Sequence, residues 1–328
     1  MRPFDYQRPE SLAKASHLTS ETETKIIAGG TNLLDLMKLQ VEVPDRVVDI
    51  NRLGMNRIGD TPEGGLRIGA LVTNTATANH LRVRADYPVL ARAILAGATQ
   101  QLRNAATTGG NLCQRTRCYY FTNIDQPCNK REPGSGCGAI KGIARLHAVL
   151  GASEHCIATY PGDMAVALCA LGASVEIATQ NGSARTEPVR EFHRLPGDTP
   201  SKDNVLEDGD IISAVILPVP VSGRQIYRKV RERSSYAFAL VSIAAIIELD
   251  AGTFARADLA FGGLAHKPWY DPRISQLLVG EAPSAGLFDE AADLLLEGAQ
   301  GYGENDFKIP LARRTLAAVL AHAAEIEL

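Results

Sequence analysis

Cysteines are concentrated in one part of this chain, and no other sequence feature restricts its fold as strongly. Of the six cysteines in 328 residues, five lie between Gly109 and Asp163, and the sixth is Cys169. Four of the five are separated by nine, eight and eighteen residues, in segments rich in Gly, Pro, Asn and Ser: Cys118, Cys128, Cys137 and Cys156. Such segments form loops, and loop side chains can converge on one point without sharing a helix face. The pattern predicts a site built from four cysteines.

Three kinds of site are compatible with these four cysteines. Structural zinc sites usually contain close CxxC pairs, which this stretch lacks. Disulfides suit an oxidising compartment, but a chain of this length can build its own core, and its N-terminus shows no secretory signal. A [4Fe–4S] cluster takes four thiolates and tolerates wide spacing, and nearby charges tune it; the candidates for those charges are Arg115, Arg117, Lys130 and Arg131. Spacing alone leaves all three kinds of site open.

The remaining two cysteines, Cys113 and Cys169, give weaker evidence for a site. Cys169 lies in the apolar run "MAVALCALGA" and Cys113 follows a leucine, and free cysteine is a common small core residue. Cys113 is a fifth choice as ligand. His155 stands beside Cys156 and could replace a thiolate, although a lone histidine beside a cysteine is more often incidental.

Length and charge limit the class of protein. At 328 residues, two or three domains are expected. The net charge of -3 creates no basic field, so no nucleic-acid partner is predicted. No apolar run reaches the roughly 20 residues of a membrane span, so no membrane insertion is predicted. Without an export signal, the default location is cytoplasmic.

Residues 1–52 have the pattern of a small βαβ unit. A strand is predicted from the β-branched run at 24–30, which ends in glycines, and another over 46–50, with a helix between them from Thr31. The loop from Ala28 to Asn32 contains two glycines, which allow a ligand to approach the backbone closely. Amide groups at the start of the following helix would face an anion such as a diphosphate. The spacing differs from GxGxxG, however, and an ordinary tight turn is the competing interpretation.

Residues 53–220 mix strands and helices around a second glycine loop. Helices are predicted over 87–98 and within the run that contains Cys169, and strands over 174–179 and 210–220. The second loop, at 103–112, combines Gly109 and Gly110 with Thr107, Thr108 and Asn111, so backbone approach is paired with hydroxyl and amide groups.

A composition shift near residue 221 predicts a further domain. It begins with a strand and a long apolar segment and ends in two leucine- and alanine-rich helices. The run "RKVRER" at 228–233 is typical of a solvated strand face. The alternative is a lysine placed against a flavin or a phosphate.

Six motifs in fixed order resemble the FAD-binding subunits of molybdenum hydroxylases, a group that includes the xanthine dehydrogenase, carbon monoxide dehydrogenase and aldehyde oxidoreductase families. They are "IIAGGTNLLDLMK", "RNAATTGGNL", "YPGDMAVALCALGA", "DIISAVILP", "YRKVRERSSYAFALVSIAA" and "FGGLAHKP". The resemblance implies an α+β fold: a two-part FAD-binding domain of the PCMH/vanillyl-alcohol-oxidase type, and a C-terminal α+β domain of the carbon monoxide dehydrogenase flavoprotein type. The implied domains are 1–220, with subdomains 1–52 and 53–220, and 221–328.

About fifty residues separate Asn111 from Asp163, where most members of this family have about ten. This insertion, at about 113–158, resembles the variant with an additional [4Fe–4S] cluster, found in the FAD subunits of periplasmic aldehyde oxidoreductase and of 4-hydroxybenzoyl-CoA reductase. The resemblance to the aldehyde oxidoreductase subunit is the stronger. It implies Cys118, Cys128, Cys137 and Cys156 as cluster ligands.

The resemblance also implies FAD-binding residues. The first loop would hold the diphosphate, a second loop would also contact FAD, and Asp163 would accept hydrogen bonds on the adenosine side. Ile212 would contribute a backbone contact, and Lys229 a cation near the flavin. Gly162 replaces the family's usual serine. The residues implied in the two loops are Lys25, Ile26, Ile27, Ala28, Gly29, Gly30, Thr31, Asn32, Leu33, Thr108, Gly109, Gly110 and Asn111.

The implied function is electron transfer in an oxidoreductase. A molybdopterin-binding large subunit would oxidise an aldehyde, a small subunit with two [2Fe–2S] clusters would relay electrons, and this chain would pass them to an external acceptor. Substrate chemistry is thus expected on a partner. The resemblance implies a periplasmic location through co-export, with the cytoplasm as the alternative. A 4-hydroxybenzoyl-CoA reductase-type subunit, a free-standing flavin reductase and a zinc-stapled binding module are the competing functions.

Overall fold

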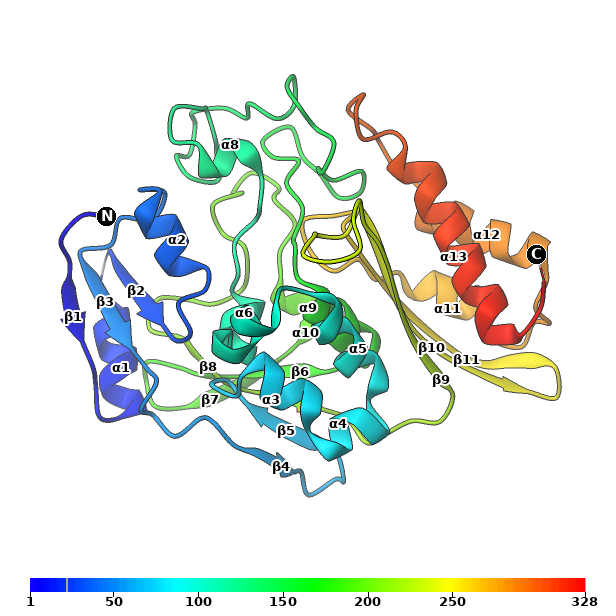
Figure 1. The fold of residues 1–328 in the computed structure, drawn as a ribbon, viewed down its shortest axis with the longest axis horizontal. Helices are drawn as coiled ribbons and strands as arrows, with labels where there is room; N and C mark the ends of the chain where they lie inside the picture. Colours follow the sequence, from blue (N-terminus) through cyan, green and yellow to red (C-terminus); the bar gives the residue numbers. More distant parts are fainter. Residues whose placement is uncertain (22, 328) are drawn as a thin grey trace.

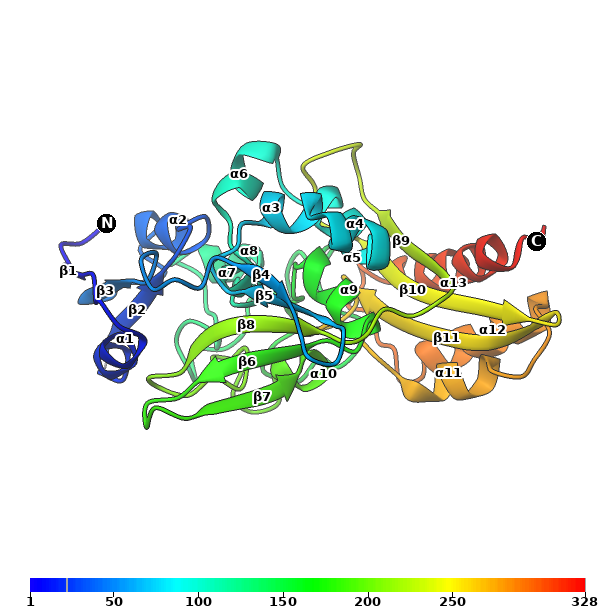
Figure 2. The same cartoon turned by 90° about the horizontal axis from the view of Figure 1, so that it is seen from below.

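The computed structural model describes residues 1–21 and 23–327, as an N-terminal unit, a central part and a C-terminal part. Figures 1 and 2 show the N-terminal unit and the C-terminal helices at opposite ends of the molecule, with the central sheet between them. Helices and strands are mixed throughout, which confirms the predicted α+β class. No helix in these two described ranges combines the length and apolar composition needed to cross a membrane.

The N-terminal unit is a parallel three-stranded sheet in the order β1-β3-β2. Strands β2 and β3 are parallel and α2 connects them, which confirms the predicted βαβ unit. Helix α1 begins after Ser11, whose hydroxyl oxygen accepts a hydrogen bond from the amide of Lys14. The elements are β1 (Asp5–Gln7), α1 (Leu12–Thr19), β2 (Thr24–Ile27), α2 (Leu33–Lys38) and β3 (Arg46–Asp49).

The central part is an antiparallel five-stranded sheet in the order β4-β5-β8-β6-β7, with helices that pack against it. Alternate residues of β6, Val175 and Ile177, point into the core that α5 and α9 cover. Its strands are β4 (Ile58–Asp60), β5 (Leu66–Gly69), β6 (Ser174–Ala178), β7 (Ala184–Pro188) and β8 (Ile211–Leu217). Its helices are α3 (Asn74–Asn79), α4 (Leu81–Asp86), α5 (Pro88–Ala96), α6 (Gln100–Ala105), α7 (Thr108–Leu112), α8 (Tyr119–Thr122), α9 (Asp163–Ala170) and α10 (Val189–Phe192).

The insertion at 113–158 contains one short helix, α8, and otherwise consists of loops, as its sequence predicts. In Figure 1 it lies at the top of the molecule, between the N-terminal unit and α13. Polar side chains satisfy its backbone: the Arg131 guanidinium donates to the carbonyls of Tyr120 and Phe121, and Asn129 Oδ1 accepts from two glycine amides. Loops with many partly buried backbone groups need such partners.

The C-terminal part is a sheet in the order β11-β10-β9 with three helices on one face. Strand β10 alternates between two cores: Ala244 and Ile246 face α5 and α9, whereas Ile243 and Ile247 pack with the C-terminal helices. Both faces are therefore buried, which explains the long apolar run at 241–247. The elements are β9 (Arg224–Val230), β10 (Val241–Asp250), β11 (Thr253–Gly262), α11 (Pro272–Leu278), α12 (Ala285–Leu295) and α13 (Lys308–Ala324).

Two local predictions were wrong. The second glycine segment is not an open loop: Thr107 caps a helical turn, α7, by accepting a hydrogen bond from the amide of Gly110. The run at 228–233 is not uniformly solvated either, because the side chain of Lys229 is only 4% exposed. The burial of Lys229 depends on Asp163, which is distant in the sequence, whereas the cap of α7 is a local hydrogen bond between Thr107 and Gly110.

Candidate functional site

A cleft of about 630 Å³ lies where the first glycine loop, the start of α9 and the β9–β10 loop meet. Its volume is within the range of small-molecule and cofactor sites. Six of the predicted binding residues line it: Thr31, Asn32, Gly110, Asn111, Asp163 and Lys229. They come from four separate segments of the chain. The structure therefore brings together the core of the predicted site.

The remaining predicted binding residues do not line the cleft. Lys25, Ile26 and Ile27 form β2, and Leu33 begins α2. Thr108 is buried and donates its hydroxyl proton to the carbonyl of Val72. Ile212 is buried in β8, where it pairs with Ile177 of β6. Its contact with a cofactor stays a prediction.

The first glycine loop, which includes Ala28, packs tightly against the end of α6. A Cβ atom added to Gly29 would lie 1.9 Å from the carbonyl oxygen of Ala105, and Gly30 has a φ of +70°, a backbone conformation that favours glycine. Asn32 ties the loop to the insertion, because its Oδ1 accepts a hydrogen bond from the amide of Arg115 at 2.8 Å. Both glycines are thus required by the local geometry.

Replacing Gly29 with alanine is expected to lower the free energy of unfolding by about 2 kcal/mol, because the methyl group forces the loop away from α6. Retention of FAD, the cofactor that the motif resemblance implies, should fall about tenfold, since the loop that lines the cleft moves. Gly59→Ala is the matched control, because its Cβ would meet no atom within 4 Å. Denaturant unfolding and flavin fluorescence measure both effects; equal behaviour of the two variants would contradict the proposed packing.

Asp163 and Lys229 form a buried ion pair at the floor of the cleft. Lys229 Nζ lies 2.8 Å from Asp163 Oδ2, and the side chains are 4% and 9% exposed. Asp163 Oδ1 also accepts a hydrogen bond from the hydroxyl of Tyr227 at 2.5 Å, and burial raises the pKa of that tyrosine. Because the carboxylate compensates the ammonium, Lys229 acts on the cleft as one half of a pair rather than as an isolated cation.

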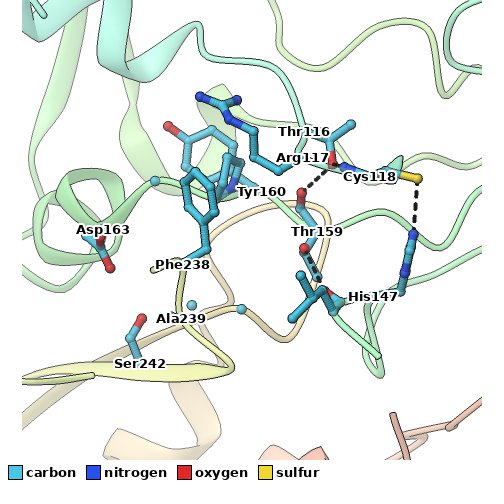
Figure 3. Close-up of a pocket in the computed structure, with 15 residues that line it drawn as sticks. Thr116, Arg117, Cys118, His147, Thr159, Tyr160, Asp163, Phe238, Ala239 and Ser242 are labelled. Carbon is cyan, nitrogen blue, oxygen red and sulfur yellow. Dashed lines mark hydrogen bonds between the residues drawn. The ribbon is translucent and has the colours of Figure 1, made fainter. Parts of the chain in front are cut away.

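Arg117 is a cleft residue that the sequence did not place correctly. It was predicted to supply charge to the cysteine site, but it lines the cleft, and its guanidinium lies 5.3 Å from the Phe238 ring centroid. Figure 3 shows its side chain directed away from the Cys118 sulfur. Burial lowers the pKa of Arg117. Arg115, two residues earlier, carries the same charge, so no local signal separated the roles of the two arginines.

The four predicted ligand cysteines line one small cavity within the insertion: Cys118, Cys128, Cys137 and Cys156. Cys128 and Cys137 face each other across an isolated antiparallel bridge. Burial raises the pKa of Cys118 to about 12 and that of Cys156 to about 11. All six cysteines are free thiols. Within residues 1–21 and 23–327, no three His, Cys, Asp or Glu side chains are close enough to hold a single metal ion.

The basic residues near this cavity are mostly engaged elsewhere. Lys130 lines the cavity, and its buried ammonium is paired with Asp203 and donates to the carbonyl of Pro200. Arg115 binds Asp203 and Glu42. Among the four basic residues predicted near the cysteines, only Lys130 lines the cavity, and an effect of any of them on a cluster stays a prediction.

The two unassigned cysteines differ. Cys169 is buried in α9, which confirms its predicted place in the core, whereas Cys113 is exposed after α7 and lies outside the cysteine cavity. His155 lines the cavity but is half exposed, with its Nε2 atom 3.6 Å from Asp198.

A second small cavity, of about 30 Å³, shares lining residues with the cleft and with the cysteine cavity (Figure 3). Cys118 and His147 line one end, and Asp163 and Phe238 line the other. Cys118 therefore belongs to both the cysteine cavity and this connection.

Comparison with known protein families gives two matches that cover most of the chain. The family described as the FAD binding domain in molybdopterin dehydrogenase matches residues 2–220. The CO dehydrogenase flavoprotein C-terminal domain matches residues 225–324.

Curated relatives agree with these families. The chain is 53% identical to the aldehyde oxidoreductase FAD-binding subunit PaoB of Escherichia coli K12, over 98% of this chain and 99% of that protein. It is 27% identical to the glyceraldehyde dehydrogenase medium chain of Sulfolobus acidocaldarius, over 88% and 85% of the two chains.

Solved structures share the fold. A chain of the carbon monoxide dehydrogenase from Oligotropha carboxidovorans superposes with a TM-score of 0.77 at 22% identity, over 99% of both chains. A chain of the quinoline 2-oxidoreductase from Pseudomonas putida 86 superposes with a TM-score of 0.74 at 24% identity, over 99% of this chain and 98% of that one.

Proposed function

Because this chain belongs to the FAD-binding subunits of the molybdenum hydroxylases, we propose that it is the electron-transfer subunit of an aldehyde oxidoreductase and carries FAD and a [4Fe–4S] cluster. The family itself makes the chain an oxidoreductase subunit. The observation that carries the aldehyde assignment is the identity of 53% with an aldehyde oxidoreductase subunit over nearly the whole of both chains.

The cleft fits FAD in its chemistry. The glycine loop leaves room for a diphosphate beside Thr31 and Asn32, and Arg117 supplies a positive charge. On the other side of the cleft, the pair formed by Asp163 and Lys229 offers both acceptor and donor atoms. When bound, FAD can accept electrons singly and release them in pairs. The protein's contribution is to bind and orient this cofactor.

The cysteine cavity fits a [4Fe–4S] cluster better than a single ion. Four sulfurs around one cavity are the donor set that such a cluster uses, whereas no three ligand side chains of the described residues suit one metal ion. The Ala158 amide donates to the Cys156 sulfur at 3.5 Å, and amide donors to sulfur are usual in such sites. Metal binding would release protons from the Cys118 and Cys156 thiols, because burial raises the pKa of both.

We place the chain between two partner subunits and an acceptor. It would receive electrons from a small subunit with two [2Fe–2S] clusters, which is reduced by a molybdopterin-binding large subunit, and pass them to an external acceptor. Co-export of this heterotrimer would place it in the periplasm. Fractionation of cells that express all three subunits tests the location, and recovery of active enzyme in the cytoplasm alone would overturn it.

The first experiment is iron, sulfide, zinc and flavin analysis of the anaerobically purified chain. One FAD and about four irons per chain are expected. Co-purification with subunits that oxidise aldehydes would support the assignment; turnover of an aryl-CoA thioester, or nicotinamide oxidation by the isolated chain, would contradict it. Zinc without flavin would overturn both cofactors.

Cys128→Ser is expected to abolish most of the iron content while FAD is retained, because the serine hydroxyl is a poor substitute for a thiolate ligand. Cys113→Ser is the control, since Cys113 lies outside the cavity in the same insertion. Iron analysis and absorption spectra check the result. Full iron content in the Cys128 variant would remove that residue from the ligand set.

A further inference from the structure

Among the described residues, His147 is the one histidine whose side chain is hydrogen-bonded to a cysteine sulfur. Its Nε2 atom lies 3.1 Å from Cys118 Sγ, within hydrogen-bond distance for sulfur. The side chain is 2% exposed, and Figure 3 shows the imidazole directed at the sulfur. Cys118 is also the cysteine that faces the connection to the FAD cleft.

The direction of this hydrogen bond follows from the chemistry of the sulfur. A cysteine that ligates a metal centre is a thiolate, which can only accept, so the proton must lie on His147 Nε2. His147 Nδ1 is buried and has no hydrogen-bond partner among the described residues. No other acceptor therefore competes for the ring proton.

The C-terminal part of the chain holds the backbone of His147 in place. Lys308 Nζ is buried and donates to the carbonyls of His147 at 2.9 Å, Leu146 at 3.2 Å and Gly263 at 2.7 Å. Asn305 Nδ2 donates to the carbonyls of His147 and Ala148, at 3.3 and 3.0 Å. Each carbonyl of the segment 146–148 thus receives a donor from the start of α13 or the loop before it.

The rings of Tyr119 and Tyr120 lie beside the imidazole, with centroid distances of 6.4 and 6.3 Å. These contacts limit rotation of the ring about its side-chain bonds. Backbone anchoring and ring packing together orient Nε2 towards Cys118. This arrangement crosses the domain boundary, since the ligand lies in the insertion and the anchors lie near residue 305.

We propose that His147 is a positioning residue that donates a hydrogen bond to the Cys118 sulfur and so raises the reduction potential of the iron–sulfur cluster. A hydrogen bond withdraws electron density from the sulfur and stabilises the more negative, reduced state. The C-terminal part would thereby influence the end of the cysteine site that faces the FAD cleft. The inference rests on the proposed cluster.

The test compares three variants of the full chain, loaded with iron–sulfur and FAD, by redox titration monitored by electron paramagnetic resonance. His147→Leu removes the donor, His147→Gln restores an amide donor of similar reach, and His155→Leu is the matched control. His155 also lines the cysteine cavity, but in the described structure its side chain makes no hydrogen bond to a cysteine sulfur. The readout is the ratio of reduced to oxidised cluster, independent of turnover.

His147→Leu is expected to shift the potential downwards, with about fivefold less reduced cluster at a fixed applied potential. His147→Gln should recover most of this loss, and His155→Leu should match the unmodified chain. An unchanged potential in His147→Leu would overturn the inference, as would an equal shift in His155→Leu.

Two other outcomes are also decisive. If His147→Leu loses its iron, the inference requires His147→Gln to retain it, and loss of iron from both variants overturns the donor role. If the unmodified chain itself contains no iron, the cluster proposal fails, and this failure is recognised before any variant is measured.

Discussion

Acidification from pH 7 to pH 5 is expected to lower the free energy of unfolding of this chain by up to about 6 kcal/mol, through three buried histidines. His147, His193 and His266 are 2%, 2% and 4% exposed. Burial lowers the pKa of each to about 4, from an ordinary value of 6.5. Lys308 adds to this effect at His147, and Lys130 adds to it at His266, where Asp203 opposes it.

The sign follows from proton binding in the two states. Between pH 6.5 and pH 4 the unfolded chain protonates its histidines while the folded chain keeps these three neutral. The unfolded state therefore binds more protons, and stability falls as the pH falls through this window. At pH 5 each histidine lowers the free energy of unfolding by about 2 kcal/mol relative to its value above pH 6.5, where this loss is absent.

Denaturant titrations at several pH values measure this dependence. His193→Gln should reduce the pH effect by about a third, because an amide can still donate to the carbonyl of Leu112, as His193 Nε2 does at 2.9 Å, but cannot be protonated. His17→Gln is the control, because His17 lies on the exposed surface of α1. Stability that stays flat between pH 7 and pH 5 would show that the three imidazoles are not buried neutral.

Lys229→Met is expected to lower the free energy of unfolding by about 4 kcal/mol, because it leaves the Asp163 carboxylate buried without its countercharge. The chain should also lose FAD, since both residues line the cleft. The double variant Asp163→Asn/Lys229→Met should recover much of the stability, because it removes the unpaired charge, and the asparagine oxygen can still accept from Tyr227.

Lys267→Met is the comparison for this prediction. Lys267 lies 4.0 Å from Glu191, whose side chain is 72% exposed, so the loss should be below about 1 kcal/mol. Denaturant unfolding of the unmodified chain, Asp163→Asn, Lys229→Met and the double variant, at one pH and salt concentration, gives the coupling energy of the buried pair, and Lys267→Met is measured under the same conditions. If the double variant is less stable than Lys229→Met, the charge-burial explanation is wrong.

Much of the fold follows from local sequence. β-branched residues indicate the strand at 24–27, Gly29 and Gly30 indicate the loop, and helically spaced leucines indicate the helix that follows. Each of these signals extends over only a few residues. The apolar run of β10 likewise reflects burial on both faces. These signals are short-range, so the chain alone reveals them.

The sequence also determines which residue types are available for chemistry. It supplies four cysteines in loop-forming segments, and the structure places all four around one cavity. It supplies the motifs that identify the family, which the comparisons confirm. What it leaves open is which of several similar side chains reaches a given site.

Only the tertiary structure determined which charged and hydrogen-bonding side chains pair with one another. In the folded chain Arg117 lines the cleft and Lys229 pairs with Asp163. His147 lies within hydrogen-bond distance of Cys118, and its backbone is bonded to side chains near residue 305. These partners lie far apart in the sequence or, like Arg117 and Cys118, are neighbours that point in different directions. Their distances depend on how separate elements pack, and no local periodicity records that. The sequence therefore predicted six of the residues that line the cleft, whereas the partner of each charged side chain depended on the tertiary structure.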